Sequence, residues 1–301
     1  MAHYHGIFPV VPTPLHEDGS FDPEGARRLL DFMVASGVHG LYALGTTGEE
    51  MLLPFSTRVQ VARTMAQINA GRLPLLMGAG SYGVQDALEF FDAVKDCRID
   101  GVHVIPYDHK LSDAAVERFF SQLADRSPFP LWMYHNPDRG RPIPIPVAAK
   151  LKNHPNIVGA KVAGYSYRYH IGLFMLQDEN FQCLGSGTSQ FLSMMALGGT
   201  AHTTSDAASF PELILELYRT YTQESLSRAR EKMFEILRFM ATMPKPALKD
   251  HGETSVECKF VLSVRGICQE FCAEPYRLLR PEEKEEILKV LKPYLESLKS
   301  R

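Results

Sequence analysis

Short apolar runs alternate with longer stretches of helical periodicity along most of the chain. Some of the runs, for example Gly101–Tyr107, are apolar almost throughout, which is typical of parallel strands that are buried on both faces. The pattern predicts eight strands, at Gly6–Thr13, Gly40–Thr46, Leu75–Gly80, Gly101–Tyr107, Leu131–Asn136, Ile157–Ala163, Phe181–Gly187 and Gly199–Ser205.

The stretches between these strands carry apolar residues at helical spacing. Leu29, Leu30 and Met33 recur in this way after Pro23, and proline is common in the first turn of a helix. Strands that alternate with helices build a parallel sheet with the helices outside it. The eight units predict an α/β fold, a single TIM (β/α)8 barrel, rather than an open sheet with two domains.

The pattern changes after the eighth unit, where only helical periodicity remains. The predicted helices are Pro211–Glu224, Ser225–Met240, Val256–Phe271 and Pro281–Leu298. We therefore expect a barrel over residues 1–224 and a C-terminal helical extension over residues 225–301 that packs on the barrel.

The composition favours chemistry on small molecules. The 301 residues are 45% hydrophobic with a formal net charge of -3, which is ordinary for a globular protein. The sequence contains neither a run of about 18 apolar residues nor a charged-then-apolar leader, so we expect a cytoplasmic protein without a membrane span. The absence of a long basic run also argues against binding to nucleic acid or to a membrane surface.

Cysteines and histidines form no metal or disulfide pattern. The five cysteines are scattered without a CxxC pair, so we expect them to be reduced. The eleven histidines lack the spacing of metal ligands, and no glycine-rich dinucleotide or P-loop signature is present. We therefore expect no metal and no bound cofactor.

A single cation, Lys161, interrupts the apolar strand Ile157–Ala163. Burial disfavours a charged ammonium, and the neutral amine is the nucleophile that condenses with a carbonyl to form an imine. The alternation of a strand places Gly159 and Ala163 on the same face, which predicts room for a substrate beside the amine. On this segment alone, a lysine that reaches solvent or pairs with a carboxylate is an equal alternative.

The preceding strand ends in a polar turn. Tyr134 is predicted to face inward with Trp132 and Asn136, on the strand beside Lys161, where its phenol is placed to transfer protons. Arg139, in the turn, suits a second carboxylate at the barrel mouth. The alternatives are a packing tyrosine and a solvated arginine.

The segment from Gly45 to Glu49 lies where the second strand stops. Its two glycines permit close approach of the backbone to a ligand, and Thr46, Thr47 and the amide of Gly48 suit an anion such as a carboxylate. A simple capped turn is the alternative. The three segments together predict an imine-forming lysine, a proton shuttle and a carboxylate-binding loop.

The eighth strand is unusually polar for a barrel strand. Thr203 is predicted to contact the distal end of the substrate. His202 has two interpretations, a pocket residue or a hydrogen-bonded core histidine, and the second is favoured.

These segments resemble the dihydrodipicolinate synthase and N-acetylneuraminate lyase family, in order and spacing, over essentially the whole chain. The resemblance rests on the opening Phe8–Pro14, the Gly45–Glu49 loop, the tyrosine strand, Gly159-Ala160-Lys161 and the helical tail. It implies that Lys161 forms an imine with pyruvate, without a further cofactor, and that Tyr134 is the acid and base.

The same resemblance implies roles for the loop and an assembly. Thr46 would hydrogen-bond Tyr134 in a proton relay, while Thr47 and the loop amides would bind the pyruvyl carboxylate. It also implies a homo-oligomer, a tetramer or a dimer.

Departures from the family pattern bear on the reaction. Asp108 follows Pro106-Tyr107, where synthases carry a second tyrosine that enters a neighbouring subunit's site. Arg139 stands where synthases hold the carboxylate of the aldehyde partner. The second tyrosine that sialic acid lyases carry beside Tyr134 is absent.

The leading hypothesis is a class I lyase that makes or breaks a carbon–carbon bond next to a pyruvyl unit, with a 2-oxo acid and an aldehyde as substrates. The alternatives are 4-hydroxy-tetrahydrodipicolinate synthase activity, a 2-oxo acid dehydratase or deaminase that uses the same imine, and a catalytically retired protein that binds a keto acid.

Overall fold

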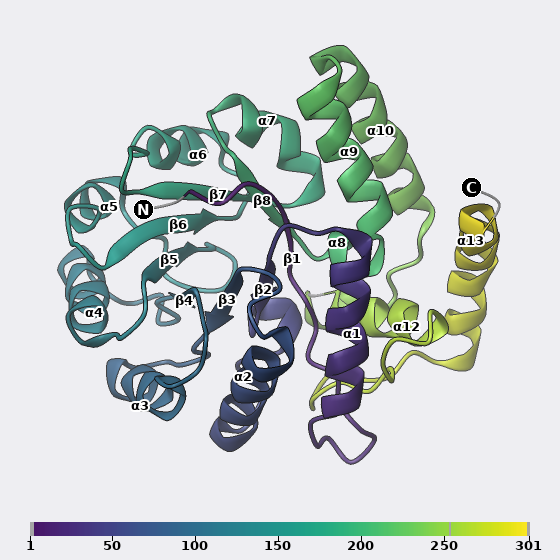
Figure 1. Ribbon diagram of the computed structural model, residues 1–301, viewed down its shortest axis with the longest axis horizontal. Helices are drawn as coiled ribbons and strands as arrows, with labels where there is room; N and C mark the ends of the chain where they lie inside the picture. Colours follow the sequence, from purple (N-terminus) through teal and green to yellow (C-terminus); the bar gives the residue numbers. More distant parts are fainter. Residues whose placement is uncertain (1–2, 253, 300–301) are drawn as a thin grey trace.

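The computed structural model describes residues 3–252 and 254–299. Its centre is a ring of parallel strands with helices outside it (Figure 1). The strands are β1 (Gly6–Pro9), β2 (Leu41–Ala43), β3 (Leu75–Gly78), β4 (Gly101–Val104), β5 (Leu131–His135), β6 (Ile157–Val162), β7 (Gln182–Ser186) and β8 (Ala201–Thr204). The predicted TIM barrel is confirmed, and each strand is shorter than the apolar run that predicted it.

The ring closes between its first two strands. From β2 to β8 each strand pairs with its sequence neighbour, and β8 pairs with β1. Just beyond β1, Val10 forms a parallel bridge with Tyr42 of β2, and the Val11 amide donates to the Tyr42 carbonyl at 3.0 Å. All strands therefore end at one rim, which is the rim where barrel active sites lie.

The surrounding helices begin and end at residues that suit those positions. In α1 the Asp22 carboxylate accepts a hydrogen bond from the Gly25 amide at 2.8 Å, and Gly37 ends the helix with a φ of 81°. The outer helices are α1 (Pro23–Ser36), α2 (Phe55–Asn69), α3 (Val84–Val94), α4 (Asp113–Arg126), α5 (Ile145–Leu151), α6 (Tyr167–Phe174) and α7 (Phe191–Ala196). Two short 3-10 helices, η1 (Thr46–Gly48) and η2 (Thr188–Gln190), follow β2 and β7 at the rim.

A small apolar cluster fills the inside of the barrel below the rim. It contains Phe8, Val10, Tyr42, Leu76, Trp132, Val158, Leu184 and Ala201. Tyr4 stacks on Trp132 with ring centroids 5.8 Å apart and covers the amino-terminal end. A Cβ at Gly159 would lie 2.4 Å from the Trp132 ring, so this glycine makes room for the indole. The expectation that Gly159 leaves space for substrate was wrong.

The chain after β8 is helical in the part that the structure describes. It contains α8 (Asp206–Ser209), α9 (Pro211–Gln223), α10 (Leu226–Thr242), α11 (Leu248–His251), α12 (Ser255–Val264) and α13 (Pro281–Lys299). The predicted helix through Phe271 was too long, because Gly266 adopts a φ of 74° and the helix ends before it.

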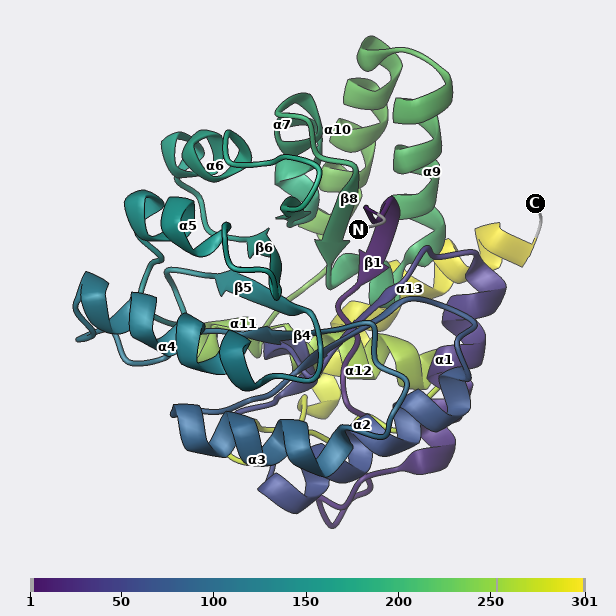
Figure 2. The same ribbon diagram turned by 60° about the vertical axis from the view of Figure 1, so that its left-hand side comes forward.

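The C-terminal helices pack on the barrel through their own apolar cluster. Both views show α9 and α10 side by side (Figures 1 and 2). The cluster joins Ile7 of β1 to Leu217 of α9, Ile236 of α10 and Leu291 of α13. It therefore crosses the predicted boundary at residue 224. No helix among the described residues is long and apolar enough to cross a membrane.

Candidate active site

Lys161 lies on β6, directly beside Tyr134 of β5 in the strand register. Its side chain is 3% exposed. Its Nζ atom is 4.1 Å from the centroid of the Tyr42 ring and 4.3 Å from that of Tyr134. No carboxylate of residues 3–252 and 254–299 lies within ion-pair distance of this amine. The lysine is therefore buried among aromatic rings rather than paired with an acid.

A cavity of about 430 Å³ opens above Lys161 at the carboxyl ends of the strands. This volume is within the range of small-molecule sites. Residues that follow or end the strands line it, among them Val10, Thr46, Thr47, Tyr134, Lys161, Ala163 and Thr204. The structure thus brings together the predicted lysine, the tyrosine and both threonines of the loop.

The phenol of Tyr134 has a different partner from the one expected. It accepts a hydrogen bond from the Asn136 amide at 3.0 Å, and Asn136 also lines the cavity. Within the described residues no hydrogen bond joins Thr46 to this phenol. The strand pattern predicts that Asn136 faces inward, but it contains no signal of the contact with Tyr134.

Tyr42 and His103 form the floor beneath the amine, and the sequence analysis missed both. Their rings stack with centroids 3.8 Å apart, and His103 Nε2 lies 3.1 Å from the Ala43 carbonyl oxygen. Burial, together with the charge of Lys161, holds the pKa of His103 well below its usual value. Burial likewise raises the pKa of Tyr42. Both groups are therefore neutral at neutral pH.

The loop after β2 has a fixed, compact shape. Leu44 and Glu49, which flank it, have φ values of 48° and 60°, a left-handed conformation that costs about 1–2 kcal/mol per residue. The Gly48 amide donates to the Gly45 carbonyl at 2.8 Å, and the Thr13 hydroxyl donates to the Gly48 carbonyl at 2.7 Å. Gly48 is not among the residues that line the cavity. It shapes the loop that presents the threonines.

A buried ion pair ties this loop to the C-terminal helices. Lys259 Nζ of α12 lies 2.6 Å from Glu49 Oε1, and both side chains are fully buried. Lys259 also donates to the Phe271 carbonyl at 2.8 Å, and Glu49 Oε2 accepts from the Ala273 amide at 2.6 Å. These contacts offset the backbone cost at Glu49. Nothing in the local sequence pattern pointed to this pair.

Comparison with known proteins places the chain in a family. A sequence model of the dihydrodipicolinate synthetase family matches residues 3–294. The chain belongs to this family. The 4-hydroxy-tetrahydrodipicolinate synthase of Methanosphaerula palustris is 33% identical over 238 residues, which cover 77% of this chain and 81% of that protein.

Solved structures agree with this assignment. Dihydrodipicolinate synthase from Bacteroides thetaiotaomicron has a TM-score of 0.89 at 25% identity, over 97% of this chain and 100% of that one. A catalytic lysine mutant of Ruminococcus gnavus sialic acid aldolase shares the fold, with a TM-score of 0.90 at 19% identity over 99% and 97% of the two chains. The predicted family is confirmed, and with it a lyase of the class I aldolase type.

Of the two β8 residues considered in the sequence, Thr203 lies differently from its prediction and His202 agrees with its favoured interpretation. Thr203 is fully buried, its hydroxyl donates to the Gly185 carbonyl at 3.0 Å, and it does not line the cavity. The next residue, Thr204, lines the cavity instead. His202 is buried with Nε2 2.9 Å from the Gly187 carbonyl oxygen, which supports the favoured interpretation as a core histidine.

Arg139 and Asp108, which bear on the synthase alternative, lie in different settings. Arg139 is half-buried and lines the cavity. Asp108 is exposed, its carboxylate accepts from the Lys110 amide at 2.9 Å, and it does not line the cavity. Asp108 therefore shapes its own loop turn and lies outside the cavity of its own chain.

One wall of the rim cavity comes from the C-terminal helices and the segments that connect them, rather than from the barrel. The residues of this wall are Leu237, Met240, Lys245, Leu248, Gly252 and Thr254. Because they follow the last strand by many residues, strand-end reasoning from the sequence did not find them.

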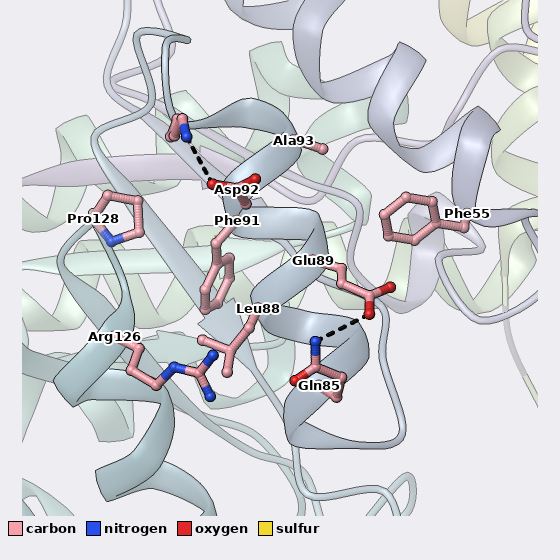
Figure 3. Close-up of a pocket in the computed structure, with 10 residues that line it drawn as sticks. Phe55, Gln85, Leu88, Glu89, Phe91, Asp92, Ala93, Arg126 and Pro128 are labelled. Carbon is pink, nitrogen blue, oxygen red and sulfur yellow. Dashed lines mark hydrogen bonds and ion pairs between the residues drawn. The ribbon is translucent and has the colours of Figure 1, made fainter.

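A second hollow, of about 590 Å³, lies on the outside of the barrel at α2, α3 and the end of α4 (Figure 3). Its polar groups are partly engaged with each other, since Gln85 donates to Glu89 at 3.0 Å and Lys95 pairs with Asp92 at 2.8 Å. None of its lining residues follows a strand at the catalytic rim. The described residues also contain no cluster of three or more potential metal ligands. The rim cavity therefore remains the candidate active site.

Proposed function

We propose that Lys161 forms an imine with pyruvate or a related 2-oxo acid and that the enzyme makes or breaks a carbon–carbon bond next to the pyruvyl unit. The observation that carries this proposal is the Lys161 amine, buried without a carboxylate partner, at the cavity and beside the Tyr134 phenol. A buried amine next to a proton donor is suited to condensation with a ketone.

The proposed chemistry balances with water and protons alone. The Lys161 amine attacks the keto carbon, and Tyr134 passes a proton to the departing hydroxyl so that water leaves and the imine forms. The Tyr134 phenolate then takes a proton from the adjacent carbon to give an enamine. The enamine carbon attacks an aldehyde, and the phenol returns the proton to the aldehyde oxygen, which becomes a hydroxyl. Water then hydrolyses the imine and frees the lysine. Asn136 holds the phenol in place during these transfers.

The carboxylate of the 2-oxo acid is assigned to the loop after β2. Thr47 lines the cavity and is buried, and Thr46 lies next to it. Hydroxyl and amide donors at such a turn suit an anion. Arg139 is assigned to a carboxylate on the second substrate. Thr204, which lines the cavity, takes the place of Thr203 as the β8 residue assigned to the distal end of the substrate.

Borohydride reduction in the presence of pyruvate tests the proposal. The adduct is expected on Lys161, located by peptide mass spectrometry, and it should be absent from the Lys161→Ala variant. Lys259 is the internal control, because it is equally buried but paired with Glu49. An unmodified Lys161 in the folded protein would contradict the imine.

Two observations bear on the synthase alternative, in opposite directions. Arg139 at the cavity favours an acidic aldehyde, as in 4-hydroxy-tetrahydrodipicolinate synthase. The exposed position of Asp108, by contrast, supplies no phenol to Tyr134. We therefore keep the carbon–carbon lyase as the proposal and synthase activity as its narrower form.

We also propose a cytoplasmic homo-oligomer, a tetramer or a dimer. Tyr82 is 68% exposed, and its ring lies 5.5 Å from that of Tyr107, just before Asp108. An exposed tyrosine that lies against the half-buried Tyr107, at the position where synthases meet a neighbouring subunit, supports an interface.

A further inference from the structure

Lys245 lies in the wall of the cavity that the C-terminal helices provide. It occupies the connection between α10 and α11. Within the described chain its ammonium takes part in no ion pair and no hydrogen bond. It is half-buried, so part of its hydration has already been removed.

The backbone on both sides of Lys245 is held in place. Pro244 and Pro246 flank it, and each proline fixes its own φ. The amides of Ala247 and Leu248 donate to the buried Glu257 carboxylate at 2.7 and 3.2 Å. Ala247 itself is fully buried. The position of the lysine is therefore set by the protein before a ligand arrives.

The surrounding wall is rich in neutral hydrogen-bonding groups. Ser205 and Thr254 line the same cavity. Asp206 also lines it, but its carboxylate accepts a hydrogen bond from the Thr188 hydroxyl at 2.6 Å and makes no ion pair with Lys245 in the described structure. A bound substrate would remove more water from the Lys245 ammonium. Because burial of an unpaired charge is costly, the ammonium then needs an anion as its partner.

We propose that Lys245 binds an anionic group at the distal end of the second substrate, so that the aldehyde carries a carboxylate or a phosphate remote from its reactive carbon. This inference rests on the proposed imine function, which supplies the cavity with its two substrates. It makes the C-terminal helices a source of substrate specificity, in addition to the strand ends.

The test compares the binding of three aldehydes to enzyme in which the imine between Lys161 and pyruvate has first been reduced with borohydride. The probes are glyceraldehyde, glyceraldehyde 3-phosphate and succinic semialdehyde, which are neutral, phosphorylated and carboxylated. We expect at least one anionic probe to bind about 10-fold or more tightly than glyceraldehyde, since a charge-assisted contact is worth about that much. Equal binding of all three would overturn the proposal.

Lys245→Met keeps the aliphatic stem and removes the charge. We expect it to weaken the preferred anionic probe by about 10-fold or more, to leave glyceraldehyde unchanged, and to be rescued largely by Lys245→Arg. Lys249→Met is the matched control, because Lys249 is exposed on α11 and does not line the cavity. A loss that is equal for neutral and anionic probes would show a merely structural role and overturn the proposal.

Failure of the Lys245 proposal can be distinguished from failure of the proposed imine function. Trapping with pyruvate alone does not need Lys245, so successful trapping without anion preference refutes the role of Lys245 and leaves the proposed function standing. If no adduct forms, the proposed function fails, and the same three probes on untreated enzyme still decide whether Lys245 binds an anion.

Discussion

The protein buries two lysines in opposite ways. Lys161, inside the barrel, is surrounded by the rings of Tyr42 and Tyr134 and has no acid within ion-pair distance in the described chain. Lys259, between the barrel and the C-terminal helices, is paired with Glu49 at 2.6 Å. Burial of a lysine therefore says little about its role until its partner is known.

The partners set what each lysine can do. The Lys259 amine is held by the Glu49 carboxylate at 2.6 Å and by the Phe271 carbonyl at 2.8 Å, so its contacts are taken up inside the protein. Aromatic rings attract a cation without forming an ion pair, so the surroundings of Lys161 also suit the cationic imine that we propose. The first arrangement supports the fold, and the second supports a reaction.

Removal of the phenol beside Lys161 tests the reactive side of this comparison. Tyr134→Phe keeps the ring that faces the amine but removes the proton donor, so we expect kcat to fall about 10²–10⁴-fold. The adduct with pyruvate should still form under borohydride, only more slowly. Steady-state turnover and the rate of adduct formation measure the two effects.

Asn136→Ala serves as the milder companion variant, because it removes only the hydrogen bond at 3.0 Å that holds the phenol. Turnover by Tyr134→Phe at the rate of the unaltered enzyme would assign proton transfer to another group.

Removal of the lysine that has an acid partner tests the structural side. Lys259→Met leaves Glu49 buried and uncompensated, so we expect the free energy of unfolding to fall by about 3–5 kcal/mol. Lys161→Met is the matched control and should cost little, because no buried acid loses its partner. Chemical denaturation measures both.

The double variant Lys259→Met with Glu49→Gln separates charge from packing. It should recover most of the loss, because no unpaired charge stays buried. A double variant as unstable as the single one would show that packing, rather than the ion pair, stabilises the loop.

The sequence drew attention to Lys161 more readily than to Lys259. Lys161 interrupts an apolar strand, so its position alone drew attention to it. Lys259 lies in a helix whose pattern is ordinary, and its partner Glu49 is brought to it only by the fold. The same reason hides Lys245, since strand ends are visible in the sequence but the return of a C-terminal segment to the rim is not.

Errors inside the barrel had a local cause. Thr203 was assigned to the substrate, but it is fully buried on the strand face of Ala201, which belongs to the inner cluster, and its hydroxyl donates to the Gly185 carbonyl. The sequence showed that the strand is polar, whereas the hydrogen-bond partner of each hydroxyl required the structure. Trp132 shows the same limit, because its direction was predicted but the space it fills beside Gly159 was not.

The barrel interior and the C-terminal helices should lose stability at different pH values. Burial lowers the pKa of His202 from 6.5 to about 4, with a further lowering by the charge of Lys161. Among the C-terminal helices, hydrogen bonds from Arg277 and Arg280 lower the pKa of Glu283 from 4.5 to about 2. As the pH decreases, both groups are protonated in the unfolded chain before they are protonated in the folded protein. The free energy of unfolding therefore decreases with decreasing pH, over a different pH range for each group.

The His202 contribution disappears as pH falls from 6.5 towards 4, whereas that of Glu283 disappears only between 4.5 and 2. At pH 4.5 the buried histidine should cost roughly 2–3 kcal/mol relative to pH 7. Urea unfolding at pH 7, 5.5 and 4.5 measures this loss, and His202→Gln, which cannot be protonated, should reduce it by that amount. The loss would have another source if the variant and the unaltered protein showed the same pH dependence. Glu283→Gln should change the pH dependence of the free energy of unfolding only below pH 4.5. The first loss of stability on acidification would then come from the barrel, which also holds Lys161.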